Sequence, residues 1–322
     1  MEILRFKPVV KRTIWGGDKI VKLKHLDTDA TDIGETWEVS GLEGCETVVS
    51  GGDYDGMRLN DVVRRMKTDL LGRDNYRRFG NEFPLLVKFI DAKADLSIQV
   101  HPDDVTAHRH GERRGKAEMW YVMESDAGAS LYSGLKQWIT PRRYKNMVAD
   151  NTICDALALY EVKEGDVFYI PAGRIHSIRS GCMIAEIQQT CDLTYRIYDY
   201  NRRGKDGQLR QLHTQKASES IDYSVERDYR THYVPRKNHA VDLVSCPYFT
   251  TALYDLDEPM TIDYSGLDSF VILVCLKGRG TVQADEDMSA LSSFVAGDVV
   301  LLPAAVKTIS ISGEVKFLET YV

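Results

Sequence analysis

Short runs of alternating apolar and polar residues, separated by turn residues, recur along most of this chain. Alternation with a period of two is typical of a half-buried β-strand, and regularly spaced short strands are typical of an antiparallel sandwich or barrel. Five runs predict strands most directly: residues 36–41 (TWEVSG), 85–92 (LLVKFIDA), 118–123 (EMWYVM), 166–171 (DVFYIP) and 183–190 (MIAEIQQT). We therefore expect a mainly β fold.

Two segments follow a helical pattern instead. Apolar residues recur at helical spacing through residues 56–80, behind an Asn/Asp start, which predicts a short helical segment in the N-terminal half. Residues 141–150 are a second candidate, because proline stands where the helix would begin. Residues 201–240 are polar and irregular, and we expect them to connect two halves of the chain.

An internal repeat links the two halves. Residues 165–178 read GDVFYIPAGRIHSI and residues 297–310 read GDVVLLPAAVKTIS, an offset of 132 residues from Gly165 to Gly297. The same offset pairs His176 with Thr308, so only the first copy keeps the histidine. The repeat predicts two similar β domains, the second without the chemistry of the first.

Composition and charge limit the classes of function. The chain has 322 residues, a net charge of −7 and six cysteines without a CxxC pair. An acidic chain argues against a nucleic-acid or anionic-membrane surface. We expect reduced thiols, no signal peptide, no membrane span and a cytoplasmic location.

Metal-ligating residue types stand at the ends of separate predicted strands. In residues 96–104 (LSIQVHPDD), Gln99 and His101 share the face opposite the apolar residues. Glu118 opens another strand, and His176 follows the turn PAG. Imidazole nitrogen and carboxylate oxygen suit Zn²⁺, and they suit Fe²⁺ and Mn²⁺ as well. Three such groups from separate strands predict an open, catalytic metal site.

Six motifs, in this order, resemble the type I mannose-6-phosphate isomerase (phosphomannose isomerase) family in its short bacterial form. The matching pieces are IWGG (14–17), IGETWEVSG (33–41), LSIQVHPDD (96–104), GKAEMWYV (115–122), IPAGRIHSI (170–178) and DLTYRIYDYNR (192–202). His176 also closes G-D-x4-P-x-G-x2-H, which resembles the second signature of the cupin barrels. The resemblance implies two cupin (jelly-roll β-barrel) domains: a catalytic, metal-binding domain at 1–235 and a degenerate one at 236–322.

The resemblance also implies the ligands and the reaction. Its ligand set carries over to Gln99, His101, Glu118 and His176 around one Zn²⁺ per chain. The implied reaction interconverts D-mannose 6-phosphate and D-fructose 6-phosphate through a cis-enediol(ate). We expect a small phosphosugar as the partner, no nucleic acid, no membrane, and a monomer or homodimer.

Catalytic and substrate-binding roles follow from the same match. The catalytic arginine of the family falls on Arg196, which would stabilise the enediolate or the phosphate. Glu186 and Asp192 match acidic positions near the site, and either could be the base. Lys116 and Arg202 are candidates for binding the phosphate dianion of the substrate. A structural ion pair between Arg196 and Glu186 is the alternative reading of those two residues.

Two other functions remain open at the level of sequence. An Fe²⁺-dependent cupin dioxygenase would use the two histidines and Glu118 equally well. A non-catalytic sugar-binding cupin would keep the barrel and lose ligands. The basic group of Lys116, Arg196 and Arg202 favours the isomerase, because a phosphosugar needs cations near the metal.

Overall fold

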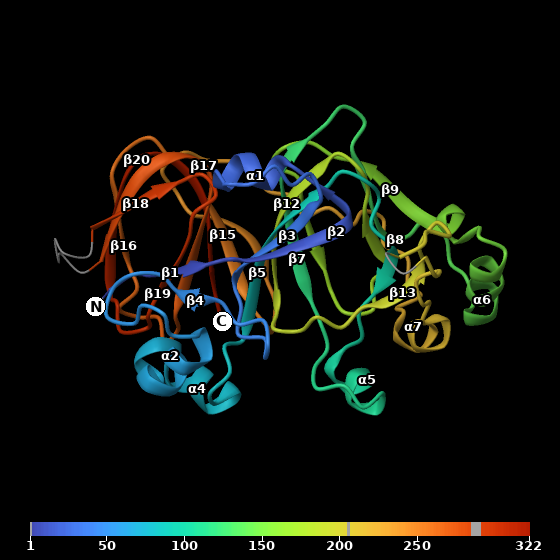
Figure 1. The fold of residues 1–322 in the computed structure, drawn as a ribbon, viewed down its shortest axis with the longest axis horizontal. Coiled ribbons are helices and arrows are strands. Elements are labelled where there is room, and N and C mark those ends of the chain that lie inside the picture. Colours follow the sequence, from blue (N-terminus) through green and yellow to red (C-terminus); the bar gives the residue numbers. More distant parts are fainter. Residues whose placement is uncertain (1, 205–206, 285–290) are drawn as a thin grey trace.

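Three antiparallel sheets, packed as successive layers, make up most of the molecule (Figure 1). The computed structural model describes residues 2–204, 207–284 and 291–322. The mainly β architecture expected from the sequence is confirmed. Within those three ranges, no helix is both long and apolar enough to cross a membrane.

A six-stranded sheet lies at the centre of the molecule, and its strands run in the order β10-β7-β12-β5-β2-β3. They are β2 (Val9–Gly17), β3 (Ile33–Val39), β5 (Leu85–Ala92), β7 (Glu118–Ser125), β10 (Val167–Ile170) and β12 (Cys182–Gln189). Every residue of β5 and β12 is buried. Both faces of these strands are covered, which explains their nearly continuous apolar sequences.

A five-stranded sheet faces the first, in the order β13-β6-β11-β8-β9. Its strands are β6 (Ile98–Val100), β8 (Ser130–Leu135), β9 (Leu157–Glu161), β11 (His176–Ile178) and β13 (Tyr195–Tyr198). A 3₁₀ turn and two helices pack on its outer apolar side: η1 (Ile153–Ala156), α6 (Pro141–Ala149) and α7 (Thr214–Ser220). Thr140 caps α6 by accepting a hydrogen bond from the Arg143 N–H, and Pro141 is its first residue, as predicted.

The C-terminal part forms a nine-stranded sheet that curls around its own core. Its strands are β1 (Leu4–Lys7), β4 (Val48–Val49), β14 (Val241–Ser245), β15 (Thr250–Leu256), β16 (Met260–Asp263), β17 (Val271–Ala284), β18 (Leu291–Val295), β19 (Val299–Leu302) and β20 (Thr308–Tyr321). β1 pairs with β19 and with β4, so N-terminal residues extend this sheet. The domain boundary at 235/236 stays a prediction. β1 and β4 precede that boundary in the sequence, but they belong to the sheet of the C-terminal part.

Apolar layers join the sheets. One core, with Trp120, Phe168 and Leu131, fills the space between the six- and five-stranded sheets. A second core on the other face of the six-stranded sheet includes side chains of the nine-stranded sheet, such as Ile272 and Leu301. The two parts of the chain therefore share one continuous buried layer.

The helical segment expected at 56–80 is three short helices rather than one. They are α2 (Leu59–Met66), α3 (Thr68–Leu71) and α4 (Arg73–Phe79). The breaks fall at Lys67, with φ of 52°, and at Gly72, with φ of 86°. A residue with positive φ cannot continue a right-handed helix, so the chain turns at both points. Two further short helices are α1 (Lys19–Lys24) and α5 (Asp104–Arg109).

The internal repeat is confirmed as a structural unit. The first copy forms β10, a turn and the start of β11, and the second forms β19, a turn and the start of β20. The strand starts keep the 132-residue offset, since Val167 corresponds to Val299 and His176 to Thr308.

Candidate metal centre and active site

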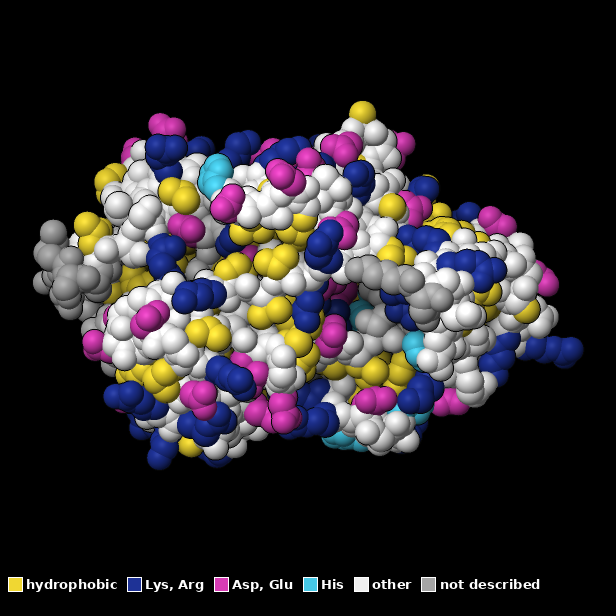
Figure 2. All heavy atoms as spheres, in the orientation of Figure 1, with side chains coloured by type: hydrophobic (Ala, Val, Ile, Leu, Met, Phe, Trp, Pro, Cys, Tyr) yellow, Lys and Arg dark blue, Asp and Glu magenta, His cyan; other side chains and the backbone are white. Residues whose placement is uncertain are grey.

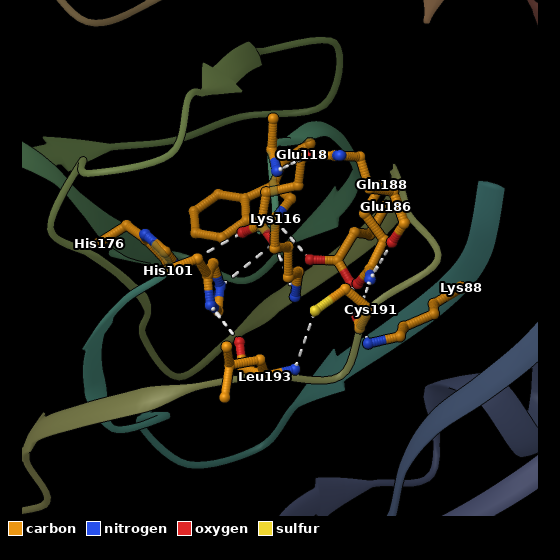
Figure 3. Close-up of polar contacts among 12 residues, drawn as sticks. Lys88, His101, Lys116, Glu118, His176, Glu186, Gln188, Cys191 and Leu193 are labelled. Atoms are coloured by element: carbon orange, nitrogen blue, oxygen red, sulfur yellow. Dashed lines mark hydrogen bonds and ion pairs between the residues drawn. The ribbon is translucent and has the colours of Figure 1, made fainter. Parts of the chain in front are cut away.

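Two histidines and one carboxylate meet between the two facing sheets (Figure 3). His101 directly follows β6, Glu118 begins β7 and His176 begins β11. The carboxylate spans both rings: Glu118 Oε2 lies 3.4 Å from His101 Nε2, and Glu118 Oε1 lies 3.4 Å from His176 Nε2. All three side chains are buried, and their ligand atoms lie within 4.8 Å of one another. The structure thus brings together three predicted ligands from three strands.

Backbone carbonyl groups fix the orientation of both rings. His101 Nδ1 lies 2.7 Å from the Leu193 carbonyl oxygen, and His176 Nδ1 lies 2.8 Å from that of Arg174. A ring that donates its Nδ1–H to a carbonyl presents an unprotonated Nε2 on the other side. Both Nε2 atoms face Glu118, which is the orientation that a metal ligand needs.

The donor atoms fit a divalent metal ion. Among the residues that the structure describes, His101 Nε2, His176 Nε2 and Glu118 Oε1 have no hydrogen-bonding partner. A buried polar atom without a partner is destabilising, by about 1–3 kcal/mol, and three at one point indicate a ligand site. Burial and the nearby Lys116 cation lower the pKa of His101 to about 3, and burial also lowers the pKa of His176. Both rings are therefore neutral and able to donate to a metal.

Gln99 stands next to this cluster in a row across the five-stranded sheet. It lies directly opposite His176 on β11 and directly opposite Arg196 on β13. Directly opposed residues project from the same face of a sheet, so the row aims Gln99, His176 and Arg196 at the same side. The role of Gln99 as a metal ligand stays a prediction.

Lys116 is held against the ligand carboxylate. Its Nζ lies 2.8 Å from Glu118 Oε2, and its side chain is 5% exposed. Burial alone would lower the pKa of Lys116, but the Glu118 and Glu186 carboxylates raise it above its ordinary value. Burial alone would raise the pKa of Glu118, but Lys116 and the two imidazoles hold it well below its ordinary range. Lys116 is therefore a fixed cation beside the metal cluster.

Glu186 pairs with a lysine that the sequence analysis did not single out. Glu186 Oε2 lies 3.3 Å from Lys88 Nζ, and Glu186 Oε1 accepts a hydrogen bond from the Trp120 indole at 3.0 Å. Lys88 Nζ also lies 3.9 Å from Glu35, and burial raises the pKa of Glu186. A lysine inside a fully buried, mainly apolar strand is a sequence signal for such a pair, because a buried charge needs a partner.

Two adjoining cavities are lined by residues that contact the cluster, Lys116 in one and Leu193 in the other. The smaller, of about 130 Å³, is lined by Lys116, Glu186, Arg196, Asp192 and Arg210, among others. The wider, of about 900 Å³, extends from the loop after β3 to residues 190–193 and shares Asp192 with the first. Figure 2 shows basic, acidic and histidine side chains around a recess near the middle of this face.

Arg196 and Arg202 occupy different surroundings. Arg196 lines the smaller cavity, and its Nη1 donates a hydrogen bond to the Gln211 carbonyl at 2.9 Å. The described contacts of Glu186 are to Lys88 and Trp120, which disfavours the alternative of a structural pair between Arg196 and Glu186. Arg202 donates to the Asp95 carbonyl and to the Asp199 carboxylate, and it is absent from the described lining of both cavities.

Two family models match the chain. The model described as "Phosphomannose isomerase type I, catalytic domain" covers residues 3–128, and "Mannose-6-phosphate isomerase, cupin domain" covers residues 239–322. The chain is 32% identical over 316 residues to "Mannose-6-phosphate isomerase ManA" of Bacillus subtilis, covering 97% of this chain and 96% of that protein. It is 29% identical to the mannose-6-phosphate isomerase of Streptococcus mutans, covering 99% and 98%.

Solved structures give the same result for the fold. The mannose 6-phosphate isomerase from Bacillus subtilis superimposes with a TM-score of 0.89 at 27% identity, over 100% of both chains. A structure described as a putative mannosephosphate isomerase from Archaeoglobus fulgidus has a TM-score of 0.79 at 20% identity, covering 100% of this chain and 97% of that one. The second likeness bears on the fold alone.

Proposed function

Because the chain belongs to the type I phosphomannose isomerase family, we propose that it interconverts mannose 6-phosphate and fructose 6-phosphate with one Zn²⁺ per chain. One observation carries the proposal beyond the family: the His101, Glu118 and His176 cluster adjoins a cavity lined by Lys116, Glu186 and Arg196. The cavity thus combines a metal site with the acid–base and cationic groups that an aldose–ketose isomerisation needs.

His101, Glu118 and His176 would hold the zinc ion, with Gln99 as a fourth ligand. When bound, the metal supplies Lewis-acid polarisation of the sugar oxygens at C1 and C2. Zn²⁺ is favoured because it is redox-inert and accepts mixed nitrogen and oxygen ligands, and the reaction requires no electron transfer.

The chain's own side chains perform the proton transfers. An aldose becomes a ketose when a proton leaves C2 and a proton returns to C1, while negative charge passes through the enediolate oxygens. Glu186 is the proposed proton carrier, because burial raises its pKa and Lys88 and Trp120 hold its two oxygens in place. Lys116 and Arg196 supply positive charge to the enediolate.

Asp192 is the alternative base, because it is exposed and lines both cavities. The variants Glu186→Gln and Asp192→Asn separate the two. The exchange of the C2 proton of mannose 6-phosphate with ²H₂O reports the base directly. Loss of exchange in Glu186→Gln alone supports Glu186, and loss in Asp192→Asn alone assigns the role to Asp192.

The proposed function is tested by a coupled assay for fructose 6-phosphate formed from mannose 6-phosphate. The assay is run on the purified protein, after removal of metal by a chelator, and after adding Zn²⁺, Mn²⁺ or Fe²⁺. Activity that is lost on chelation and restored best by Zn²⁺ supports both the reaction and the metal. Inactivity with every metal would overturn the proposal, and best activity with Fe²⁺ would overturn the choice of zinc.

A cytoplasmic location is part of the proposal. All six cysteines are free thiols, which is typical of proteins in a reducing compartment.

A further inference from the structure

Three arginines gather around one buried carboxylate beside the active-site cavity. Asp199 is 4% exposed, and Arg202 and Arg210 both form ion pairs with it. The third arginine, Arg196, is close enough for the charges of Arg210, Asp199 and Arg202 to act on it. Three cations share one anion, so the group carries an excess of about two positive charges.

The three guanidinium groups are not equivalent. Arg202 is used by the fold: it donates to the Asp95 carbonyl and to Asp199, and its guanidinium lies 5.3 Å from the centroid of the Tyr200 ring. Arg196 and Arg210, in contrast, both line the cavity that adjoins the metal cluster. The excess charge therefore faces the cavity through these two residues.

Each of the two cavity-lining arginines keeps donors for a ligand. Arg196 Nε is buried and has no hydrogen-bonding partner among the described residues. Arg210 contacts Asp199 through Nη1, at 3.4 Å and 3.2 Å from the two carboxylate oxygens. These distances are long for a charge-assisted bond, so the contact orients Arg210 without using all of its donors.

We infer that Arg210, held by Asp199, binds the phosphate dianion of the sugar, while Arg196 beside it keeps its assignment to the enediolate. This inference rests on the proposed function and transfers the phosphate-binding role from Arg202 to Arg210. A dianion matches the excess of two charges, and the planar guanidinium fork is suited to two phosphate oxygens at once. Arg210 thereby selects phosphorylated over unphosphorylated sugars.

The test is the binding of inorganic phosphate to the metal-loaded protein, measured by calorimetry. Arg210→Met keeps an unbranched apolar stem and removes the guanidinium with its charge, and we expect the dissociation constant for phosphate to rise tenfold to a hundredfold. Arg210→Lys keeps the ion pair with Asp199 but not the fork, and its binding should be intermediate. Arg203→Met is the matched control, because Arg203 is exposed in the same loop and donates only to the Gly207 carbonyl among its described contacts.

Steady-state kinetics separate a binding role from a structural one. In Arg210→Met, the KM for mannose 6-phosphate should rise by the same factor as the phosphate dissociation constant, with a smaller change in kcat. Phosphate binding equal to that of the wild type would overturn the inference and leave the proposed function intact. A wild-type protein without isomerase activity that still binds phosphate through Arg210 would overturn the proposed function alone.

Discussion

Gln99 on β6 lies directly opposite His176 on β11, with both side chains on the face of the five-stranded sheet that meets the metal cluster. β6 has only three residues, and both predicted ligands from this region lie at its end: Gln99 in the strand itself and His101 at the position just after it. The geometry of the site is therefore set by strand register, because a shift of one residue would turn Gln99 to the opposite face.

Metal content should distinguish the role of His176 from that of Gln99. His176→Ala removes a ligand with an unpartnered Nε2, and we expect metal binding to be lost while the β fold remains. Gln99→Ala should weaken binding by about 10–100-fold, the effect of losing a weak or supporting ligand. Metal titration and circular dichroism measure both effects, and Gln137→Ala, at an exposed glutamine, is the control. Unchanged affinity in Gln99→Ala would remove Gln99 from the ligand set.

Arg196→Ala should separate catalysis from metal binding. Arg196 lines the cavity but lies outside the histidine–carboxylate cluster, so metal content should stay near that of the wild type. Turnover should fall by about 10²–10³-fold, because one preorganised cation next to the developing negative charge is lost. Exposed Arg227 provides the control variant Arg227→Ala. A fall in metal content in Arg196→Ala would show that the arginine supports the metal site instead.

Lys88→Met should destabilise the folded protein. Lys88 and Glu186 are 4% and 3% exposed, and removal of one partner leaves a buried charge without compensation. We expect a loss of about 3–5 kcal/mol in the free energy of unfolding, measured with denaturant. The double variant Lys88→Met/Glu186→Gln should recover part of that loss.

A surface pair provides the control for this experiment. Lys237 lies 2.7 Å from Asp255, and its side chain is 55% exposed. Lys237→Met should leave the free energy of unfolding nearly unchanged, because water screens an exposed pair. Equal losses at Lys88 and Lys237 would contradict the assignment of a tightly coupled buried pair.

Glu319 should make stability depend on pH. It is 5% exposed in the nine-stranded sheet, where Tyr264 donates a hydrogen bond to it at 2.5 Å and Tyr254 and Asp242 also face it. Burial raises its pKa above the ordinary value of 4.5. The folded state thus holds the proton more tightly, and this contribution to stability is full below pH 4.5 and lost as pH rises through the folded pKa.

The variant Glu319→Gln removes that dependence while keeping an acceptor for Tyr264. We expect it to be more stable than the wild type at pH 8, by about 1–2 kcal/mol, and to lose this advantage near pH 4. Thermal unfolding across that range measures the difference. If the wild type instead became more stable than Glu319→Gln as the pH rises, the raised pKa of Glu319 would be contradicted.

The strands, and the meeting of His101, Glu118 and His176 in one cluster, were the most predictable parts of the molecule. The run 85–92 is β5 residue for residue, because a strand buried on both faces has a mainly apolar sequence, interrupted here only by Lys88 and Asp91. The turn motif before His176 likewise predicted the start of a strand. The internal repeat predicted a second strand start at Thr308, and β20 begins there. Local patterns sufficed in these places because each element carries its own periodicity and turn residues.

Contacts formed across the fold were less predictable. The helical periodicity of 56–80 did not reveal the breaks at Lys67 and Gly72, which depend on backbone conformation. Arg202 and Arg210 lie in one irregular loop, where no periodicity indicates which side chain faces a cavity. Lys88 was missed because its partners, Glu35 and Glu186, come from strands far away in the sequence.

The pairing of β1 with β19 has a consequence for the order of folding. Leu4 pairs with Leu301, so β1 leaves the ribosome long before its partner strand β19 has been made. Closing so long a loop is slow, and contacts of this kind belong to the late steps of folding. During synthesis β1 can already pair with β4, but Leu4 and Arg5 still lack their partners on β19. This open part of β1 is a point where chaperones or a premature partner strand can act.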